Sequence, residues 1–323
     1  MADEQAKPDE TFKPDAVHRE IASQGFLAHL MLQFSVAWLF LTRIPLPGWW
    51  NTPEPSTPAT EAYGAEEGVA PREDAAQHQG NTPATAPALD KGKTMLALAD
   101  TVRAWPVVGL LIGAMAGVAL WLAAHAGLSP LAASFVALIV AALATGVLHE
   151  DGLADLADGF GGGADKTAKL RIMRDSHIGT YGVLALLLGV GVKASSLGGF
   201  NSPALAAGAL IGAHALSRAV LPMMMVMMIP VRRSGLGKGA GQPKREDAVM
   251  AAAIGVLIAV LALGFGPGLV ASVLAALAAA GVGWLAQRQI GGYTGDVLGA
   301  AQQAAEIVVL AGLAVGLRTV FYA

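Results

Sequence analysis

Long apolar segments dominate this chain from Trp105 onward and constrain its fold more than any other feature. A helix needs about 20 mostly apolar residues to cross a bilayer, and it satisfies its own backbone hydrogen bonds there. Only 14% of the 323 residues are charged, against about 25% in soluble domains. The sequence therefore predicts an all-α fold, a polytopic integral membrane helical bundle with about seven transmembrane helices. The approximate spans are 105–125, 131–149, 181–199, 204–229, 249–265, 268–286 and 301–320.

The chain before Trp105 divides into three parts. Residues 1–24 form a polar N-terminal tail, and residues 51–94 are rich in Pro, Ala, Thr, Glu and Gly, which predicts a disordered insertion. Between them, Phe26 to Leu41 is apolar but short, and we expect an interfacial or re-entrant helix rather than a full span. Residues 25–50 and 95–323 are then a single membrane-embedded catalytic domain. The absence of cysteine excludes disulfides, thiolate metal sites and covalent cysteine catalysis.

Basic residues occur in alternate connectors. Lysines and arginines lie within 91–103, 166–174 and 232–245 and at Arg288, whereas the connectors 126–130, 200–203 and 266–267 contain none. By the positive-inside rule, the basic connectors face the cytoplasm. Lys193 lies near a span end, where a long side chain can snorkel to the membrane surface, and we assign it no role.

Four acids fall within nine residues in the stretch HEDGLADLADG that closes the second span, namely Glu150, Asp151, Asp155 and Asp158. In a helix, Asp151, Asp155 and Asp158 lie within roughly 60° of one another. Carboxylates about 6 Å apart repel by about 3 kcal/mol per pair at an effective dielectric near 20. A bound cation would relieve this repulsion, so we predict a Mg²⁺ site that also takes a substrate phosphate. The alternative is a solvated helix cap with scattered charge.

The next stretch, GFGGGADKTAKLRIMRDSHIGTYG, is rich in glycine and basic residues. Gly161 and Gly162 would let backbone N–H groups approach an anion, and a short helix is expected from 165 to 174. Arg174 and His177 are candidate ligands of phosphate oxygens, and Asp175 is a candidate metal ligand or base. A plain positive-inside loop is the alternative.

Other polar residues interrupt the apolar spans. Arg218 lies deep in the fourth span on the same helix face as His214, where it either binds substrate or forms a structural ion pair. Asp296 begins the last span and is a candidate to complete the metal site, and Glu306 follows inside that span. Lys238 lies in SGLGKGAG, which lacks Walker A spacing, so phosphate binding and a flexible loop both remain open.

Several motifs together resemble one known family, the cobalamin 5′-phosphate synthases, also called adenosylcobinamide-GDP ribazoletransferases. They occur in the family's order over nearly all of residues 26–320, and the acidic tail and the insertion at 51–94 depart from it. The matching pieces are TRIP at 42–45, Trp105-Pro106 with Gly109, HEDGLAD through Gly159, IMRDS at 172–176 with IGTYG at 178–182, Ser217-Arg218, GLG at 235–237 and YTGDVLG at 293–299.

This resemblance implies a multi-pass enzyme of the bacterial inner membrane with its active site on the cytoplasmic side. Such an enzyme uses Mg²⁺ to join adenosylcobinamide-GDP to α-ribazole, or to its 5′-phosphate, and releases GMP. Its expected partners are the corrinoid nucleotide, α-ribazole and the lipid bilayer, with no nucleic acid; a homo-oligomer or a complex with other cobalamin-assembly enzymes is left open.

The resemblance also suggests roles for the candidate residues. Asp151, Asp155 and Asp158, with Glu150 and Asp296, would hold Mg²⁺ against the diphosphate. Arg174 would stabilise charge as GMP leaves, and Asp175 or Asp158 would accept the proton of the attacking hydroxyl. Substrate binding is assigned to the following set: Arg218, Lys238, His177, Arg43, Gly161 and Gly162.

Two other functions fit parts of the sequence. A CDP-alcohol phosphotransferase would need the pattern Asp-x-x-Asp-Gly-x-x-Ala-Arg. The chain begins it at Asp155, but Gly162 and Gly163 stand where Ala-Arg is required. A membrane transporter could use Arg218 and Glu306 along a permeation path, although it would not need clustered acids and basic loops on one face.

Overall fold

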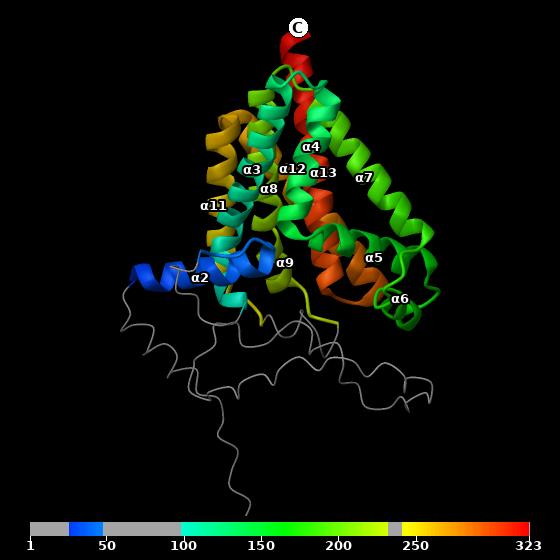
Figure 1. Ribbon diagram of the computed structural model, residues 1–323. Helices are drawn as coiled ribbons and strands as arrows, with labels where there is room; N and C mark the ends of the chain where they lie inside the picture. The colour runs from blue at the N-terminus through cyan, green and yellow to red at the C-terminus, as the bar shows by residue number, and fades with distance from the viewer. Residues whose placement is uncertain (1–25, 48–97, 232–240, 323) are drawn as a thin grey trace, which may run out of the picture.

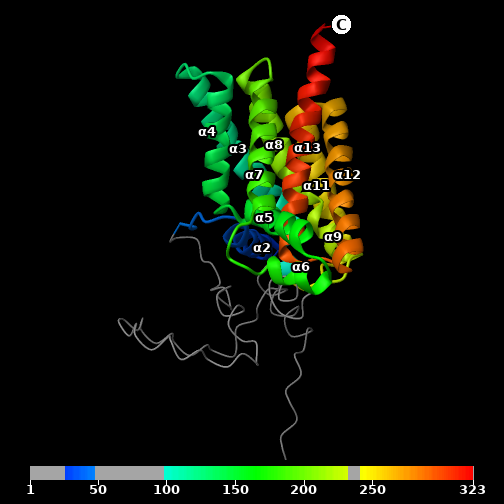
Figure 2. The same ribbon diagram turned by 90° about the vertical axis from the view of Figure 1, so that its right-hand side faces the viewer.

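The computed structural model describes residues 26–47, 98–231 and 241–322. The long helices run along the main axis of a bundle (Figures 1 and 2). Within the described residues, six spans are long and apolar enough to cross a membrane, or seven if a bent helix pair counts as one. The predicted all-α membrane bundle is thereby confirmed. The bundle helices are α3 (Trp105–His125), α4 (Pro130–Thr145), α7 (Thr180–Gly198), α8 (Pro203–Ala219), α11 (Arg245–Leu263), α12 (Phe265–Ile290) and α13 (Gly295–Tyr322).

Local sequence signals set several helix ends. Ser129 and Ser202 cap α4 and α8 by accepting hydrogen bonds from Ala132 N (3.3 Å) and Leu205 N (3.2 Å), and a proline follows each serine. Hydroxyl caps followed by proline are typical of helix starts. At the other end, Gly146 (φ 61°) terminates α4 in the left-handed conformation that glycine adopts without steric cost.

The predicted second span at 131–149 forms as helix α4 but ends earlier than expected, because the chain turns sharply after Thr145. Helix α4 ends at Thr145, and α5 (Leu148–Gly162) leaves it at 92°. The turn is made by two consecutive residues with positive φ, Gly146 (61°) and Val147 (56°). Helix α5 therefore lies across one end of the bundle (Figure 1), and the acid cluster is on this crosswise helix rather than at the end of a membrane span.

The short helices gather at the same end of the bundle as α5. They are α2 (Phe26–Leu41), η3 (Leu98–Ala104), α6 (Lys166–Ile172) and α9 (Leu221–Met227) (Figures 1 and 2). With 16 residues, α2 is shorter than a typical span, and it lies crosswise, as expected for the N-terminal helix. Helix α6 and the basic start of α11 also lie at this end, so the described parts of these two basic connectors share one side (Figure 1). The predictions for 1–24 and 51–94 fall outside the described residues.

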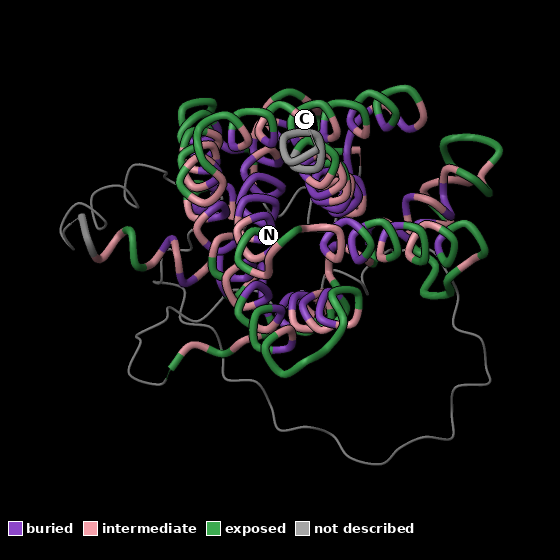
Figure 3. Tube along the Cα trace, turned by 90° about the horizontal axis from the view of Figure 1, so that it is seen from above, coloured by how far each residue is buried: buried purple, intermediate pink, exposed green. Residues whose placement is uncertain are grey.

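Small residues allow the central helices to pack closely. A Cβ atom on Gly113 of α3 would lie 2.7 Å from the Ile211 Cα of α8, and one on Gly117 would lie 3.2 Å from the Ala207 Cα. Such small-residue contacts are typical of helix interfaces in membranes. Large apolar side chains such as Leu143, Leu187 and Leu261 point outward instead. The buried residues accordingly line the interior in Figure 3, and the exposed apolar surface suits contact with lipid.

Candidate active site

The crosswise helix α5 meets the start of α13 in direct backbone contact. A Cβ atom on Gly152 would lie 3.0 Å from Asp296 O and 3.1 Å from Gly299 Cα, so any larger residue would push the two helices apart at this crossing. Asp151 precedes Gly152 on α5, and Asp155 follows it by about one turn. The fold therefore brings Asp296, from 145 residues further along the chain than Asp151, next to the acid helix.

The acids of α5 have different environments, although they share a helix. Asp151 is exposed, Asp155 is half-buried and Asp158 is buried, because the far end of α5 packs under the start of α7. In the part of the chain that the structure describes, no three His, Asp or Glu side chains form a group that could hold a metal ion alone. Mg²⁺ is usually held by one or two carboxylates together with substrate phosphates and water. An ion of that kind would need only one or two of the acids on α5 and at the start of α13.

Asp158 caps the start of α7. Its Oδ2 accepts a hydrogen bond from Gly179 N (2.7 Å) and its Oδ1 accepts one from Gly182 N (2.8 Å). A Cβ atom on either glycine would lie about 3 Å from the carboxyl carbon, at 2.9 Å and 3.1 Å respectively. Both oxygens therefore serve the fold, and the metal and base roles predicted for Asp158 would have to compete with these two bonds.

The glycine-rich stretch after the acids is helical rather than a loop. Helix α5 continues through Gly162, so the open backbone on which the anion-binding prediction for Gly161 and Gly162 was based does not form. Gly161 instead makes room for an aromatic ring, since a Cβ atom there would lie 2.6 Å from Tyr181 Cγ. At Gly162 a Cβ atom would meet Ile172 Cδ1 at an ordinary 3.5 Å.

The connection from α6 to α7 exposes the predicted phosphate ligands. Helix α6 forms where the sequence predicts a short helix, and Arg174, Asp175 and His177 follow it in exposed positions. Asp175 Oδ1 accepts hydrogen bonds from His177 Nδ1 (2.7 Å) and His177 N (3.0 Å). These bonds, the side-chain one above all, lower the pKa of Asp175, so its carboxylate is ionised at neutral pH.

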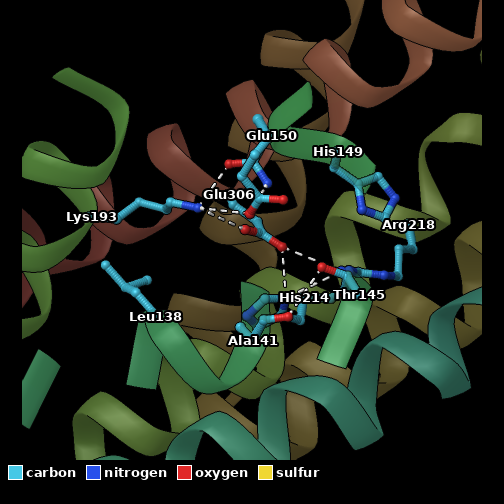
Figure 4. A pocket seen from close by; sticks show the side chains of 10 residues that line it. Leu138, Ala141, Thr145, His149, Glu150, Lys193, His214, Arg218 and Glu306 are labelled. Carbon is cyan, nitrogen blue, oxygen red and sulfur yellow. Dashed lines mark hydrogen bonds and ion pairs between the residues drawn. The ribbon is translucent and has the colours of Figure 1, made fainter. Parts of the chain in front are cut away.

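Arg218 lies in the interior of the bundle, away from that connection. It is 1% exposed, and its Nη1 atom lies 3.3 Å from Glu306 Oε1, which also accepts a hydrogen bond from His214 Nδ1 at 2.7 Å (Figure 4). This arrangement is the structural ion pair that the sequence left open. Substrate binding by Arg218 stays a prediction without a contact to support it.

The snorkelling prediction for Lys193 is wrong. Its side chain is buried, with the residue 4% exposed, and Nζ donates to Gln303 Oε1 (2.7 Å) and lies 3.4 Å from Glu306 Oε2. Acids on other helices attract the ammonium group inward. The sequence offered one signal for this, since Gln302, Gln303 and Glu306 interrupt an otherwise apolar last span.

The remaining candidates lie around the bend or outside the described residues. Glu150 faces the interior, where its Oε1 accepts a hydrogen bond from Gln303 Nε2 (3.0 Å), and is not grouped with the other acids. Arg43 is exposed, its N donates to Ala144 O (2.8 Å), and its side chain lies against Gly146. Lys238 falls outside the residues that the structure describes.

Comparison with known proteins identifies the family. Residues 83–314 match the sequence profile of the cobalamin-5-phosphate synthase family. The chain belongs to this family. The match includes the acid helix, the α6–α7 connection and Asp296, so every part of the crossing described above lies within the shared region of cobalamin-5-phosphate synthases.

Curated relatives agree with this assignment. A protein of Bradyrhizobium diazoefficiens named adenosylcobinamide-GDP ribazoletransferase is 47% identical over 214 residues, which cover 66% of this chain and 82% of the relative. Proteins of the same name from Mesorhizobium japonicum and Azorhizobium caulinodans are 44% and 45% identical, over 69% and 66% of this chain and 85% and 83% of their own lengths. No solved structure gives a significant match.

Proposed function

We propose that this chain is an adenosylcobinamide-GDP ribazoletransferase, which uses Mg²⁺ to join adenosylcobinamide-GDP to α-ribazole and releases GMP. The observation that carries the proposal is the crossing of α5 and α13 at Gly152, which brings the backbone of Asp296 against the helix that carries Asp151 and Asp155. The exposed Arg174 connection lies at the same end of the bundle (Figure 1). Carboxylates next to an arginine suit a diphosphate substrate with a shared cation. The names of the relatives supply the substrates.

Asp151, Asp155 and Asp296 are the residues that would hold Mg²⁺, because Asp158 and Glu150 are engaged in the fold. When bound, the ion would neutralise charge on the diphosphate oxygens and so favour departure of GMP. Few carboxylate ligands are expected here, because the remaining ligands of a Mg²⁺ ion come from substrate phosphate and water.

Arg174 and Asp175 are the residues proposed to act on the reacting groups. The ribazole hydroxyl oxygen forms a bond to the cobinamide-linked phosphorus, and the bond from that phosphorus to the oxygen of GMP breaks. Arg174 would hold phosphate oxygens as charge moves onto GMP. Asp175, ionised and exposed, would accept the hydroxyl proton, although its lowered pKa makes it a weak base.

The placement of the site follows the charge asymmetry of the bundle. Helix α5, the Arg174 connection and the basic start of α11 lie at one end of the bundle (Figure 1). By the positive-inside rule that end faces the cytoplasm, so we place the chain in the bacterial inner membrane with its site on the cytoplasmic side. Assembly as a homo-oligomer, or with other cobalamin-assembly enzymes, stays a prediction.

GMP release tests the proposal. Purified protein in detergent is incubated with adenosylcobinamide-GDP and α-ribazole, with Mg²⁺ or with EDTA, and GMP is quantified. We expect GMP only with metal and with both substrates, and a parallel reaction with α-ribazole 5′-phosphate compares the two acceptors. Metal-independent release, or none with either acceptor, would contradict the proposal.

Variants then test the metal-site residues. Asp151→Asn and Asp296→Asn should each lower GMP release by at least about 100-fold and raise the Mg²⁺ concentration needed for half-maximal rate. Asp165→Asn is the matched control, because Asp165 is an exposed acid that caps α6 through Ala168 N (2.9 Å). An Asn side chain retains the capping oxygen, so this variant should keep the parent rate.

A further inference from the structure

A buried polar network joins the bundle helices to α5. Glu306 of α13 is its centre: Oε1 is paired with His214 and Arg218 of α8, and Oε2 lies 3.4 Å from Lys193 Nζ of α7. Figure 4 shows these side chains converging on a small cavity between the helices. Residues from α4, α5, α7, α8 and α13 line that cavity, so the network lies where these five helices meet.

Gln303 connects this centre to the acid helix. Its Oε1 accepts a hydrogen bond from Lys193 Nζ (2.7 Å), and its Nε2 donates to Glu150 Oε1 (3.0 Å). Lys193 Nζ also lies 3.9 Å from the same Glu150 oxygen. Glu150 Oε2 is buried without a hydrogen-bond partner, so the attachment of Glu150 depends on Oε1 and hence on Gln303 and Lys193.

Helix α5, which carries Glu150 in its first turn, needs such an attachment. Helix α5 turns by 92° from α4 through Val147, whose φ of 56° is strained for a β-branched residue. Strained backbone persists only where the surrounding contacts maintain it. Glu150 is three residues beyond the strained position and directly before Asp151. A contact at Glu150 therefore acts on the first turn of α5, where the direction of the helix is set.

The charges in this network make it sensitive to the loss of a single partner. Lys193 and Arg218 supply two cations, and Glu150 and Glu306 supply two anions, all in a largely apolar interior. A buried pair is most sensitive to the loss of one partner, since the remaining charge is left without compensation. Removing both a cation and an anion should therefore be better tolerated than removing the cation alone.

We propose that Lys193, Gln303 and Glu306 are positioning residues that anchor Glu150 and so hold α5 across the bundle with Asp151 and Asp155 at the α13 crossing. The inference rests on the proposed function for its effect on catalysis, but the anchoring itself is a structural statement that can be measured separately. It assigns Glu150 to the anchor rather than to the metal.

The main variant is Gln303→Met, which keeps the length and bulk of the side chain and deletes the amide oxygen and the amide nitrogen, which bond Lys193 and Glu150. The matched control is Arg103→Met, which removes a cation paired with Asp247 of α11 (Nε to Oδ1, 2.7 Å) rather than with a residue of the Glu306 network. If positioning is lost, kcat/KM for adenosylcobinamide-GDP should fall on the order of 100-fold, as a displacement of about 1 Å can cause. The control should keep the parent value.

A spectroscopic measurement reports the position of α5 directly. The chain has no cysteine, so Ala157→Cys on α5 and Gln287→Cys on α12 give two specific sites for spin labels. The distance distribution between the labels should be narrow in the parent and in Arg103→Met, and broadened or shifted in Gln303→Met. Lys193→Met should broaden it as well, and adding Glu150→Gln to Lys193→Met should restore much of the narrow distribution.

The outcomes separate the two claims. An unchanged distance distribution in Gln303→Met and Lys193→Met overturns the anchoring inference, whatever the enzyme does. If the parent releases no GMP while the distances change as expected, the proposed function fails and the anchoring stands. If Gln303→Met is not recovered folded from membranes, the test rests on comparing Lys193→Met with the double variant Glu150→Gln/Lys193→Met. A distance distribution that is equally broad in the single and the double variant refutes the anchor.

Discussion

The cap that Asp158 provides to α7 can be separated from catalysis by comparing two aspartates on the same helix. Asp158→Ala removes the acceptor of two backbone N–H groups, at 2.7 Å and 2.8 Å, at a residue that is 7% exposed. Hydrogen bonds to a charged acceptor contribute about 1.5–3 kcal/mol each. We therefore expect a loss of about 3 kcal/mol or more. Asp151→Ala, at an exposed position in the first turn of α5, should cost about 1 kcal/mol or less.

Thermal unfolding in detergent, followed by circular dichroism, measures the difference. At roughly 2–4 °C per kcal/mol for domains of about 150–250 residues, Asp158→Ala should lower the midpoint by about 6 °C or more, and Asp151→Ala by only a few degrees. At temperatures below both midpoints, the order of the defects should reverse for activity: Asp151→Ala should lower the rate of GMP release more than Asp158→Ala does. If Asp158→Ala unfolds within about 2 °C of the parent yet releases no GMP, Asp158 acts in catalysis and our assignment of it as a cap is wrong.

Three further predictions follow from the contacts around this cap. Gly182→Ala places a methyl group against the capping carboxylate and should lower the unfolding midpoint, whereas Gly191→Ala, which meets nothing within 4 Å, should not; equal midpoints would contradict the packing. Arg174→Ala should lower kcat/KM for adenosylcobinamide-GDP by about 10-fold or more, with part of the activity retained in Arg174→Lys, because a point charge replaces a two-pronged donor. His177→Ala should move the acid limb of the kcat/KM profile to higher pH, because it removes the side-chain hydrogen bond that contributes most to the lowered pKa of Asp175; an unmoved limb would exclude Asp175 as the base.

Much of the fold was predictable because hydropathy and charge act locally along the chain. The apolar runs gave the bundle, and the alternate basic connectors gave its two sides. The α4–α5 bend was not predictable in this way, since HEDGLADLADG continues a helical pattern and only Gly146 marks a break. The direction that the chain takes after Gly146 and Val147 depends on what α5 packs against.

The candidate site, too, was predictable only in part. The sequence identified the acids, the Arg174 connection and Asp296 by residue type and spacing. It did not distinguish their roles, because hydrogen bonds formed by distant residues decide them. Asp158 differs from Asp151 through Gly179 and Gly182, and neither glycine carries a chemical signal of its own.

The sequence by itself determined that this chain is a helical membrane protein with acids and basic connectors on one side, because lipid solvation and the cost of moving charge across a bilayer depend on composition alone. Only the tertiary structure decided which of those charges face the solvent. Lys193, Arg218 and Glu306 are buried because helices far apart in the chain supply the opposite charge. Asp296 lies against the acid helix because two glycines, Gly152 and Gly299, let α5 and α13 touch. Burial and pairing are properties of contacts between helices, and no local pattern contains them.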